Sequence, residues 1–204
     1  MKNALIVIPA RYKSSRFPGK PLVNIRGISM IEHVWNKCKE VKKYADAIVA
    51  TDDSRIADHC KRKKIKFIIT KKNCITGTDR VAEVAKKTSY ELYINIQGDE
   101  PFIDTKDLIS FMKVAFKNKD IVMNGMTKIR NKKEFSNPNI PKVVVSENNK
   151  LLYMSRNNIP VNKLSLAKEL MKQVCVYSFP KKILIKIFKN KKSKLEMIED
   201  IEIL

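Results

Sequence analysis

A cluster of basic and small residues near the amino terminus has the composition of a phosphate-binding loop. It follows an apolar run that ends at Pro9, and its cations, hydroxyls and single glycine are Arg11, Lys13, Ser14, Ser15, Arg16, Gly19 and Lys20. Backbone N–H groups in a turn can bind an anion, glycine allows close approach, and Arg and Lys neutralise phosphate charge. The Walker A pattern is absent. A triphosphate is the expected ligand, although a solvent-facing basic loop would have the same composition.

A carboxylate after a second apolar run is the other candidate for chemistry. The run at 92–96 leads into Gln-Gly-Asp-Glu-Pro at 97–101, which places Asp99 directly after a glycine. Glycine lets the backbone approach a ligand, and Mg²⁺ in proteins takes one or two carboxylates together with phosphate oxygens. Asp99 is therefore a candidate magnesium ligand. The alternative is a turn in which this Asp serves as a cap.

The first half of the chain alternates apolar runs with helical patterns, and this alternation would position both segments. Strands are predicted at 4–8, 46–51, 66–70 and 92–96, and helices at 30–38, 54–60, 80–87 and 105–117. The first strand is a continuous β-branched run, typical of a strand buried on both faces. Ser54 is the predicted N-cap of the helix at 54–60. The alternation predicts an α/β fold with a mostly parallel sheet, whose ligand site lies at the carboxyl ends of the strands.

The second half is less regular and richer in strands. Strands are predicted at 121–126, 142–146, 151–155 and 173–178, and helices at 180–189 and from 194 to 204. Asn148-Asn149, between two of these strands, is a hairpin turn signal. We expect one domain, with a nucleotide-binding part at 1–120 and a smaller β-rich part at 121–180.

The charge of the chain is strongly positive, yet its distribution argues against a nucleic-acid partner. The formal net charge is +21 and the pI is about 9.8, which would suit a binder of phosphate backbones. The lysines, however, are spread along the whole sequence rather than gathered in one patch. Solvated surfaces explain such a distribution, so no nucleic acid is expected as a partner.

Cysteine spacing and hydropathy indicate a cytoplasmic protein. Cys38, Cys60, Cys74 and Cys175 are widely separated, so neither a zinc site nor a redox pair is expected. The amino-terminal apolar run is too short for a signal peptide, and no other run reaches the length of a membrane span. Reduced thiols and no membrane partner are the expectation.

Six short segments, spread over nearly the whole chain, follow one another in the order of a known family's motifs. They are Pro-Ala-Arg-Tyr-Lys-Ser-Ser-Arg-Phe-Pro-Gly-Lys-Pro-Leu at 9–22, Val-Ala-Thr-Asp at 49–52, Thr-Gly-Thr-Asp-Arg at 76–80, Asn-Ile-Gln-Gly-Asp-Glu-Pro at 95–101, Asn-Pro-Asn at 137–139 with Lys-Val-Val at 142–144, and Ser-Arg-Asn-Asn-Ile-Pro at 155–160. In this order they resemble the 3-deoxy-manno-octulosonate cytidylyltransferases (CMP-Kdo synthetases), which are related to other enzymes that make CMP-sugars.

The resemblance implies a magnesium-dependent nucleotidyltransferase for lipopolysaccharide or capsule synthesis. An anomeric hydroxyl of an acidic sugar would attack the α-phosphate of CTP, and pyrophosphate would leave. Arg11 and Lys20 would bind the triphosphate and stabilise charge on the leaving group, and Asp99 would hold Mg²⁺. The resemblance further implies a Rossmann-like nucleotide-diphospho-sugar transferase sheet flanked by helices, with 121–180 as a sugar-binding and dimerisation part of a homodimer.

The same match assigns the binding residues. Those expected to contact the nucleotide are Pro9, Ala10, Arg11, Ser15, Lys20, Thr76, Gly77 and Arg80, and those expected to contact the sugar are Gln97, Arg156 and Gln173. Arg suits a carboxylate because its planar fork donates two bonds at once. For Arg80 and Arg156, a salt bridge that holds a loop is the open alternative. His33 and His59 lie outside the motifs and are expected to be surface or packing residues.

Two departures from the family pattern leave the sugar and the activity open. The family carries His-Gly where this chain has Gln173-Val174, which suggests another acidic sugar, such as a nonulosonate or an amino-Kdo. The family also continues, beyond the segment that matches 193–196, through a further helix, a strand and a second magnesium-binding Asp, whereas this chain ends at Leu204. The alternatives are cytidylyl transfer to another such sugar and a catalytically weak nucleotide-binding homologue.

Overall fold

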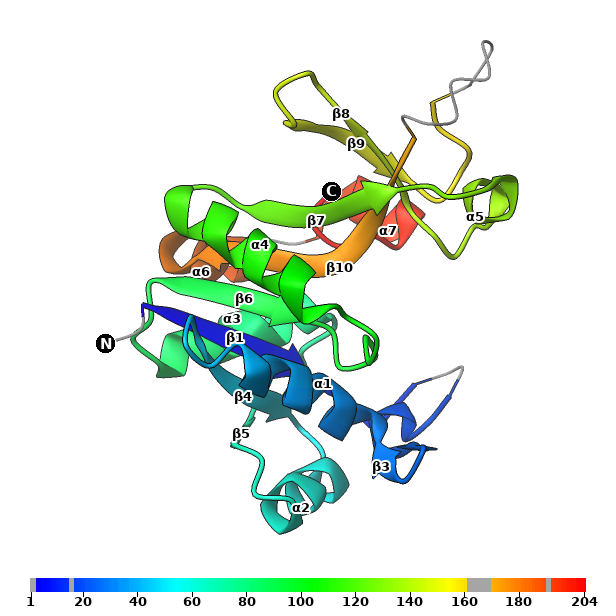
Figure 1. The fold of residues 1–204 in the computed structure, drawn as a ribbon. Coiled ribbons are helices and arrows are strands. Elements are labelled where there is room, and N and C mark those ends of the chain that lie inside the picture. The colour runs from blue at the N-terminus through cyan, green and yellow to red at the C-terminus, as the bar shows by residue number, and fades with distance from the viewer. Residues whose placement is uncertain (1–2, 15–16, 161–169, 190–191) are drawn as a thin grey trace. The chain divides into compact units, whose positions relative to one another are not determined.

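The computed structural model describes residues 3–14, 17–160, 170–189 and 192–204 (Figure 1). Two compact units divide the chain: Met1–Met123 with Cys175–Asn190, and Asn124–Val174 with Lys191–Leu204. Within the described residues, no helix is both long and apolar enough to cross a membrane. Each unit is described by itself.

The first unit is built on a parallel sheet. Its parallel strands lie in the order β5 (Phe67–Ile69), β4 (Asp46–Thr51), β1 (Ala4–Pro9) and β6 (Leu92–Ile96), and the second half of β10 (Met171–Pro180) pairs antiparallel with β6. Every residue of β1 and β6 is buried, as a sheet covered on both faces requires. The predicted α/β fold with a mostly parallel sheet is confirmed, and β1 and β6 end side by side.

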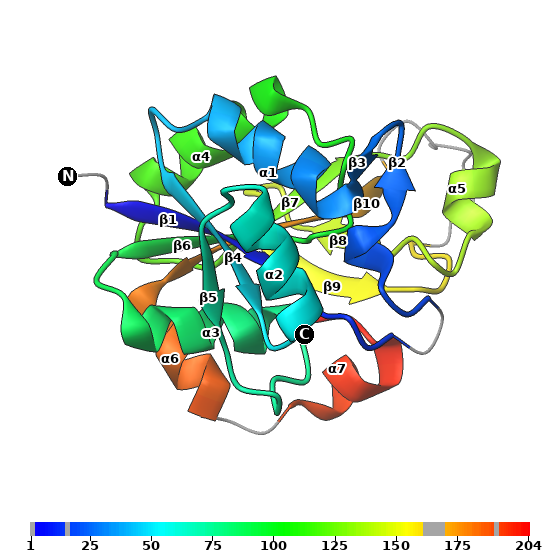
Figure 2. The ribbon, with the colours of Figure 1, turned by 90° about the horizontal axis from the view of Figure 1, so that it is seen from below.

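Helices cover both faces of this sheet. They are α1 (Met30–Glu40), α2 (Ser54–Arg62), α3 (Gly77–Lys87), α4 (Thr105–Lys117) and α6 (Lys181–Lys189). Figure 2 shows α1 and α4 on one face and α3 and α6 on the other. A single-turn 3-10 helix η1 (Lys20–Leu22) and a short hairpin of β2 (Asn24–Ile25) and β3 (Ile28–Ser29) precede α1. The sequence did not predict these last three elements.

The N-cap of one helix and the start of another differ from the predicted ones. The N-cap of α2 is Asp53 rather than Ser54, because the Asp53 carboxylate accepts a bond from the Arg55 N–H at 3.0 Å. The start of α3 lies three residues earlier than predicted, since Thr76 and Asp79 form a capping box around its first turn. Both differences arise from side-chain caps, which decide a helix start more strongly than apolar periodicity does.

The second unit contains β7 (Met123–Lys128), α5 (Lys132–Ser136), the hairpin of β8 (Lys142–Val145) and β9 (Leu151–Ser155), the first half of β10, and α7 (Lys194–Glu199). The predicted turn is confirmed: Ser146 N–H donates to the Lys150 carbonyl at 2.9 Å, and Asn149 adopts a left-handed φ of 58°. A small core gathers Val143, Met154 and Ile201.

The predicted helix from 194 to 204 is wrong beyond Glu199. Asp200 has a φ of 50°, which ends the helix, and the Ile203 N–H then donates to the Glu196 side chain at 3.0 Å. The turn buries Ile201, which is 3% exposed. Burial of this one apolar side chain is incompatible with a straight continuation of α7.

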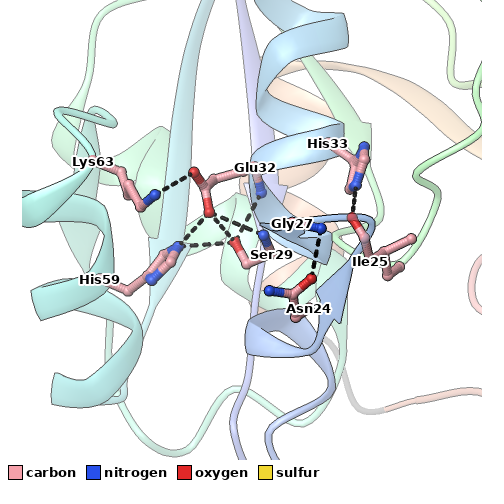
Figure 3. A network of polar contacts seen from close by, with 8 residues as sticks. All are labelled: Asn24, Ile25, Gly27, Ser29, Glu32, His33, His59 and Lys63. Carbon is pink, nitrogen blue, oxygen red and sulfur yellow. Dashed lines mark hydrogen bonds and ion pairs between the residues drawn. The ribbon is translucent and has the colours of Figure 1, made fainter.

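A polar network joins the start of α1 to α2 (Figure 3). Ser29 and Glu32 form a capping box, His59 Nε2 lies 2.8 Å from Ser29 Oγ and 3.1 Å from Glu32 Oε2, and Lys63 Nζ lies 3.2 Å from Glu32 Oε1. Ser29 and Glu32 meet the same ring nitrogen, so His59 cannot relay a proton between them as in a catalytic triad. His33 contacts the Ile25 carbonyl at 2.8 Å. Both histidines therefore make structural contacts.

This network makes stability dependent on pH in the acid range. Burial alone would raise the pKa of Glu32, but bonds from the Ser29 backbone and hydroxyl and from Lys63 lower it from 4.5 to about 2. A lowered folded-state pKa contributes stability that is present above pH 4.5 and lost as pH falls toward about 2. Glu32→Gln should lower the free energy of unfolding at pH 7 by about 3 kcal/mol.

The loss should shrink as pH approaches 2, because the wild-type carboxylate is then protonated as well. Urea unfolding at a series of pH values measures it. Asp58→Asn, which removes an exposed carboxylate from the same helix α2, is the matched control and should leave the acid limb unchanged. Equal acid limbs for Glu32→Gln and the wild type would contradict the assignment.

Candidate functional site

The two segments that the sequence singled out meet at the carboxyl ends of β1 and β6. Lys20 Nζ donates to Asp99 Oδ2 at 2.6 Å, and the two side chains are 38% and 46% exposed. A cation from one loop and a carboxylate from the other are thus both within reach of a ligand. This ion pair is the centre of the candidate site.

The loop after β1 is closed by its own backbone. Gly19 N–H donates to the Tyr12 carbonyl at 2.8 Å, and Leu22 N–H donates to the Gly19 carbonyl at 2.8 Å, which begins η1. Gly19 has a φ of +73°, and a Cβ there would lie 3.1 Å from two carbons of the Tyr12 ring. The positive φ and the close ring both favour glycine at this position, and Lys20 is the next residue.

Two further glycines bring the neighbouring segments together. A Cβ on Gly98 would lie 2.8 Å from the Pro9 carbonyl oxygen, so the turn that carries Asp99 packs on the backbone at the end of β1. A Cβ on Gly77, at the start of α3, would lie 2.7 Å from Gln97 Nε2. The first contact is with rigid backbone and the second with the end of a flexible side chain.

These two contacts predict different outcomes for the same substitution. Gly98→Ala should lower the free energy of unfolding by about 1–3 kcal/mol, because the backbone of β1 must shift. Gly77→Ala should leave stability almost unchanged but displace Gln97. Urea unfolding and steady-state kinetics of the pair measure this. Equal stability losses in the two variants would contradict the contact geometry.

The start of α3 completes the site in the first unit. Arg11 Nη1 donates to the Ile75 carbonyl at 3.2 Å, and the Asp79 carboxylate accepts the Ile75 N–H at 3.0 Å and the Thr76 N–H at 2.8 Å. The Thr76 hydroxyl accepts from Asp79 N–H at 3.1 Å. Arg11, Thr76 and Gly77 are thus brought to the same edge as Lys20 and Asp99, with the Thr76 hydroxyl acting as a cap.

Pro9 and Ala10 are buried, so only their backbones can take part in a site. The Ala10 N–H already donates to the Ala50 carbonyl at 2.9 Å. Ser15 lies outside the described residues. For these three predicted nucleotide contacts, the structure thus describes a backbone position for the first two and leaves the third a prediction.

Arg80 is engaged within the protein. Its side chain is 3% exposed, its Nη2 lies 3.0 Å from Asp52 Oδ1, and its Nη1 donates to Thr70 Oγ1. Asp52 follows β4 and Thr70 follows β5, so Arg80 joins the carboxyl ends of two strands to α3. Of the two predicted roles, the geometry supports the salt bridge that holds a loop.

Arg156 and Gln173 belong to the second unit. The Arg156 guanidinium donates to the Glu199 carbonyl and the Asp200 carbonyl, each at 2.7 Å, and to the Pro138 carbonyl at 3.2 Å. Gln173 Nε2 donates to Asn124 Oδ1 at 3.2 Å. Arg156 thus ties the segment after α7 to the hairpin, as the predicted loop-holding alternative describes, and Gln173 holds β7.

Lys142 organises the backbone beside Arg156. Its ammonium is fully buried and donates to the carbonyls of Asn137, Ile140 and Arg156 at 2.9, 3.0 and 2.8 Å. Burial lowers the pKa of Lys142, and the charge of Arg156 lowers it further. Three carbonyl acceptors satisfy the three donors of the ammonium. Lys142, the first residue of Lys-Val-Val at 142–144, thus contacts Asn137, the first residue of Asn-Pro-Asn at 137–139.

Three residues near the first-unit site were not predicted from the sequence. Glu100 stands beside Asp99 and is half-buried; burial raises its pKa, and the Asp99 charge raises it further. Tyr12 and Arg55 stack on each other, with the guanidinium carbon 3.3 Å from the ring centroid. The signal for Glu100 was its position directly after Asp99. No local signal joins Tyr12 to Arg55, because the two are distant in sequence.

A cavity of about 570 Å³ lies elsewhere in the first unit, between α1, the start of β4 and the connection from α2 to β5. Trp35, Ile65 and several lysines line it, but none of the predicted site residues does. The candidate site is thus an open edge of the sheet and is distinct from this cavity.

Comparisons with known proteins agree with the motif order. A family model described as cytidylyltransferase matches residues 5–204. The 3-deoxy-manno-octulosonate cytidylyltransferase of Fusobacterium nucleatum is 40% identical over 198 residues, covering 96% of this chain and 80% of that protein. The 8-amino-3,8-dideoxy-manno-octulosonate cytidylyltransferase of Shewanella pealeana is 35% identical, covering 98% and 84%.

A solved structure extends the similarity to the whole backbone. The structure of CMP:2-keto-3-deoxy-manno-octonic acid synthetase complexed with CTP superposes with a TM-score of 0.91 at 36% identity, covering 99% of this chain and 83% of that chain. The identity is high enough for the likeness to extend beyond the fold.

Proposed function

This chain belongs to the cytidylyltransferase family, and we propose that it transfers CMP from CTP to the anomeric hydroxyl of 3-deoxy-manno-octulosonate. The observation that carries the proposal is the 2.6 Å contact between Lys20 and Asp99, at the edge where β1 and β6 end. A phosphate-binding loop and a metal-binding carboxylate must lie close together for this reaction. The proposed role is a step in lipopolysaccharide or capsule synthesis.

In the proposed reaction, the anomeric oxygen of the sugar forms a bond to the α-phosphorus of CTP. The bond from that phosphorus to the oxygen bridging to the β-phosphate breaks, pyrophosphate leaves, and the proton of the sugar hydroxyl passes to solvent. Arg11 and Lys20 neutralise the phosphates, which holds the substrate in line and stabilises charge on the leaving group. Most of the rate enhancement would come from positioning and charge neutralisation rather than from a protein nucleophile.

Magnesium is part of the proposal, and the residues present fit it. Asp99 offers an exposed carboxylate beside the cations of the phosphate loop, and Glu100 adds a second carboxylate next to it. The described residues contain no cluster of three or more His, Cys, Asp or Glu side chains that could hold a metal alone. Mg²⁺ in proteins usually binds one or two carboxylates together with substrate phosphates. Asp99 would hold the ion, which would supply Lewis-acid stabilisation of phosphate charge.

The Lys20–Asp99 pair gives the site a defined state before substrate arrives. Each side chain satisfies the other, and each must exchange this partner when CTP and Mg²⁺ bind. An exposed pair of this kind contributes at most about 1 kcal/mol to stability. Exchanging this partner for a ligand therefore costs little free energy.

A second candidate sugar is the 8-amino analogue of 3-deoxy-manno-octulosonate. The observation in its favour is the Shewanella pealeana relative, together with Gln173-Val174 where the family carries His-Gly. Steady-state kinetics at saturating CTP and Mg²⁺ should be compared for 3-deoxy-manno-octulosonate, its 8-amino analogue and a nonulosonate. We expect the highest kcat/KM for the first. A higher value for either of the others would reassign the sugar.

A homodimer and a cytoplasmic location belong to the same proposal. The dimer is supported by apolar side chains of the second unit that are exposed in a single chain, on β9 and α7: Leu152, Leu195, Met197 and Ile198. Sedimentation velocity at micromolar concentration measures the assembly. A purely monomeric species would contradict this part of the proposal.

A further inference from the structure

Tyr12 lies in the phosphate loop between two contacts that its sequence position does not explain. The Arg55 guanidinium carbon is 3.3 Å from the centroid of its ring. At the hydroxyl end of the ring, a Cβ added to Gly19 would lie 3.1 Å from Cε2 and Cζ and 3.2 Å from the hydroxyl oxygen. The Tyr12 ring therefore lies close to both the Arg55 guanidinium and Gly19.

Asp53 fixes the direction of Arg55. Its Oδ1 accepts from Arg55 Nε at 2.9 Å and its Oδ2 from Nη2 at 2.7 Å, while Oδ1 also accepts the Arg55 backbone N–H at 3.0 Å as the cap of α2. The bonds from the Arg55 side chain lower the pKa of Asp53. The Arg55 side chain is 55% exposed, so burial does not hold it in place. The two-point ion pair does so, because a planar guanidinium matches a carboxylate in one orientation.

Gly19 connects this stack to Lys20. Its N–H donates to the Tyr12 carbonyl, and the Tyr12 ring lies beside it, so Gly19 is adjacent to both the backbone and the side chain of Tyr12. Lys20 follows at once and donates to Asp99. Asp53, Arg55, Tyr12, Gly19 and Lys20 form a continuous series of contacts from the start of α2 to the centre of the candidate site.

We infer that Arg55 is a positioning residue for the phosphate loop, acting through Tyr12 to hold Lys20 in place for CTP. The inference rests on the proposed function. Holding a binding loop in its bound conformation beforehand reduces the ordering that the ligand must otherwise bring about, and this improves affinity. A loosened loop should thus weaken CTP binding more than it slows the chemical step.

The test uses variants of both partners. Arg55→Gln and Tyr12→Leu should each raise the KM for CTP about fivefold and change kcat by less than about twofold, which is the scale of an exposed cation–π contact. Tyr12→Phe keeps the ring and removes only the hydroxyl, so its KM for CTP should stay closer to the wild-type value than that of Tyr12→Leu. Arg62→Gln removes an exposed cation from the same helix and is the matched control. The KM for CTP of the double variant should be no higher than that of the more affected single variant, because both substitutions remove the same contact.

A second measurement does not depend on turnover. Hydrogen exchange of the Gly19 amide, without substrate, should be at least about fivefold faster in Arg55→Gln than in the wild type or Arg62→Gln. If the wild type bound no CTP and released no pyrophosphate, the proposed function would fail, and the exchange rates would still decide whether Arg55 holds the loop. Should Arg55→Gln fold poorly, the comparison of Tyr12→Phe with Tyr12→Leu decides instead.

Two results would overturn the inference. One is an unchanged KM for CTP in Tyr12→Leu and Arg55→Gln alongside lowered thermal stability, which would make the stack a purely structural contact. The other is an unchanged exchange rate at Gly19 in both variants. A fall in kcat without a rise in KM would likewise contradict a role in holding Lys20 for CTP.

Discussion

Replacement of Asp99 with Asn should lower kcat by about a hundredfold to a thousandfold. Asn cannot balance the charge of a metal ion, and a group that stabilises charge in the transition state contributes on this scale. Without metal, the same variant should bind CTP at least as tightly as the wild type, since the carboxylate that pairs with Lys20 at 2.6 Å is gone. Loss of turnover with retained binding is the expected combination.

Pyrophosphate release gives kcat, and calorimetric titration with CTP in a chelator gives the metal-free affinity. Asp107→Asn, at an exposed carboxylate on α4 of the same unit, is the control and should match the wild type in both. If Asp99→Asn kept turnover within about threefold of the wild type, Asp99 would not be the metal-binding carboxylate.

Replacement of Lys20 with Gln should reduce kcat/KM for CTP by about a hundredfold, with contributions from both a higher KM and a lower kcat. The ammonium would neutralise the triphosphate in the ground state and the leaving pyrophosphate in the transition state. The fold should survive, because the pair with Asp99 is exposed on both sides and contributes little to stability.

Steady-state kinetics with varied CTP separates the two contributions. Lys20→Arg keeps the charge and should recover part of the activity, whereas Lys113→Gln, an exposed lysine on α4, should have no effect. An unchanged kcat/KM in Lys20→Gln would remove the loop after β1 from the nucleotide site.

The strands that carry the site could be predicted because their sequences leave few alternatives. β1 and β6 are fully buried apolar runs, as expected of parallel strands covered on both faces, and the second half of β4 is buried as well. Their parallel pairing places the following loops at one edge of the sheet. The meeting of Lys20 and Asp99 follows from this topology, although the two residues are 79 positions apart.

Helix boundaries were predicted less well because single side chains set them. Asp53 caps α2 in place of Ser54, and Thr76 with Asp79 starts α3 before its apolar pattern begins. The end of α7 depends on the left-handed Asp200, which allows Ile201 to be buried. None of these side chains changes the hydrophobic periodicity, which is the feature of the sequence that predicts the helices and strands.

The roles of Arg80 and Arg156 could not be decided from sequence motifs. The sequence left open whether Arg80 and Arg156 bind ligand or hold loops, and in the structure each is satisfied by protein partners. The stack of Arg55 on Tyr12 had no signal at all in the sequence. Contacts between loops depend on tertiary packing, and no local pattern encodes them.

The most direct test of the account is the reaction itself. The protein is incubated with CTP, Mg²⁺ and 3-deoxy-manno-octulosonate, and both products are followed. We predict one pyrophosphate released for each CMP-sugar formed. Binding of CTP without release of pyrophosphate, for this sugar, its 8-amino analogue and a nonulosonate alike, would contradict the central claim and leave a nucleotide-binding homologue without transferase activity.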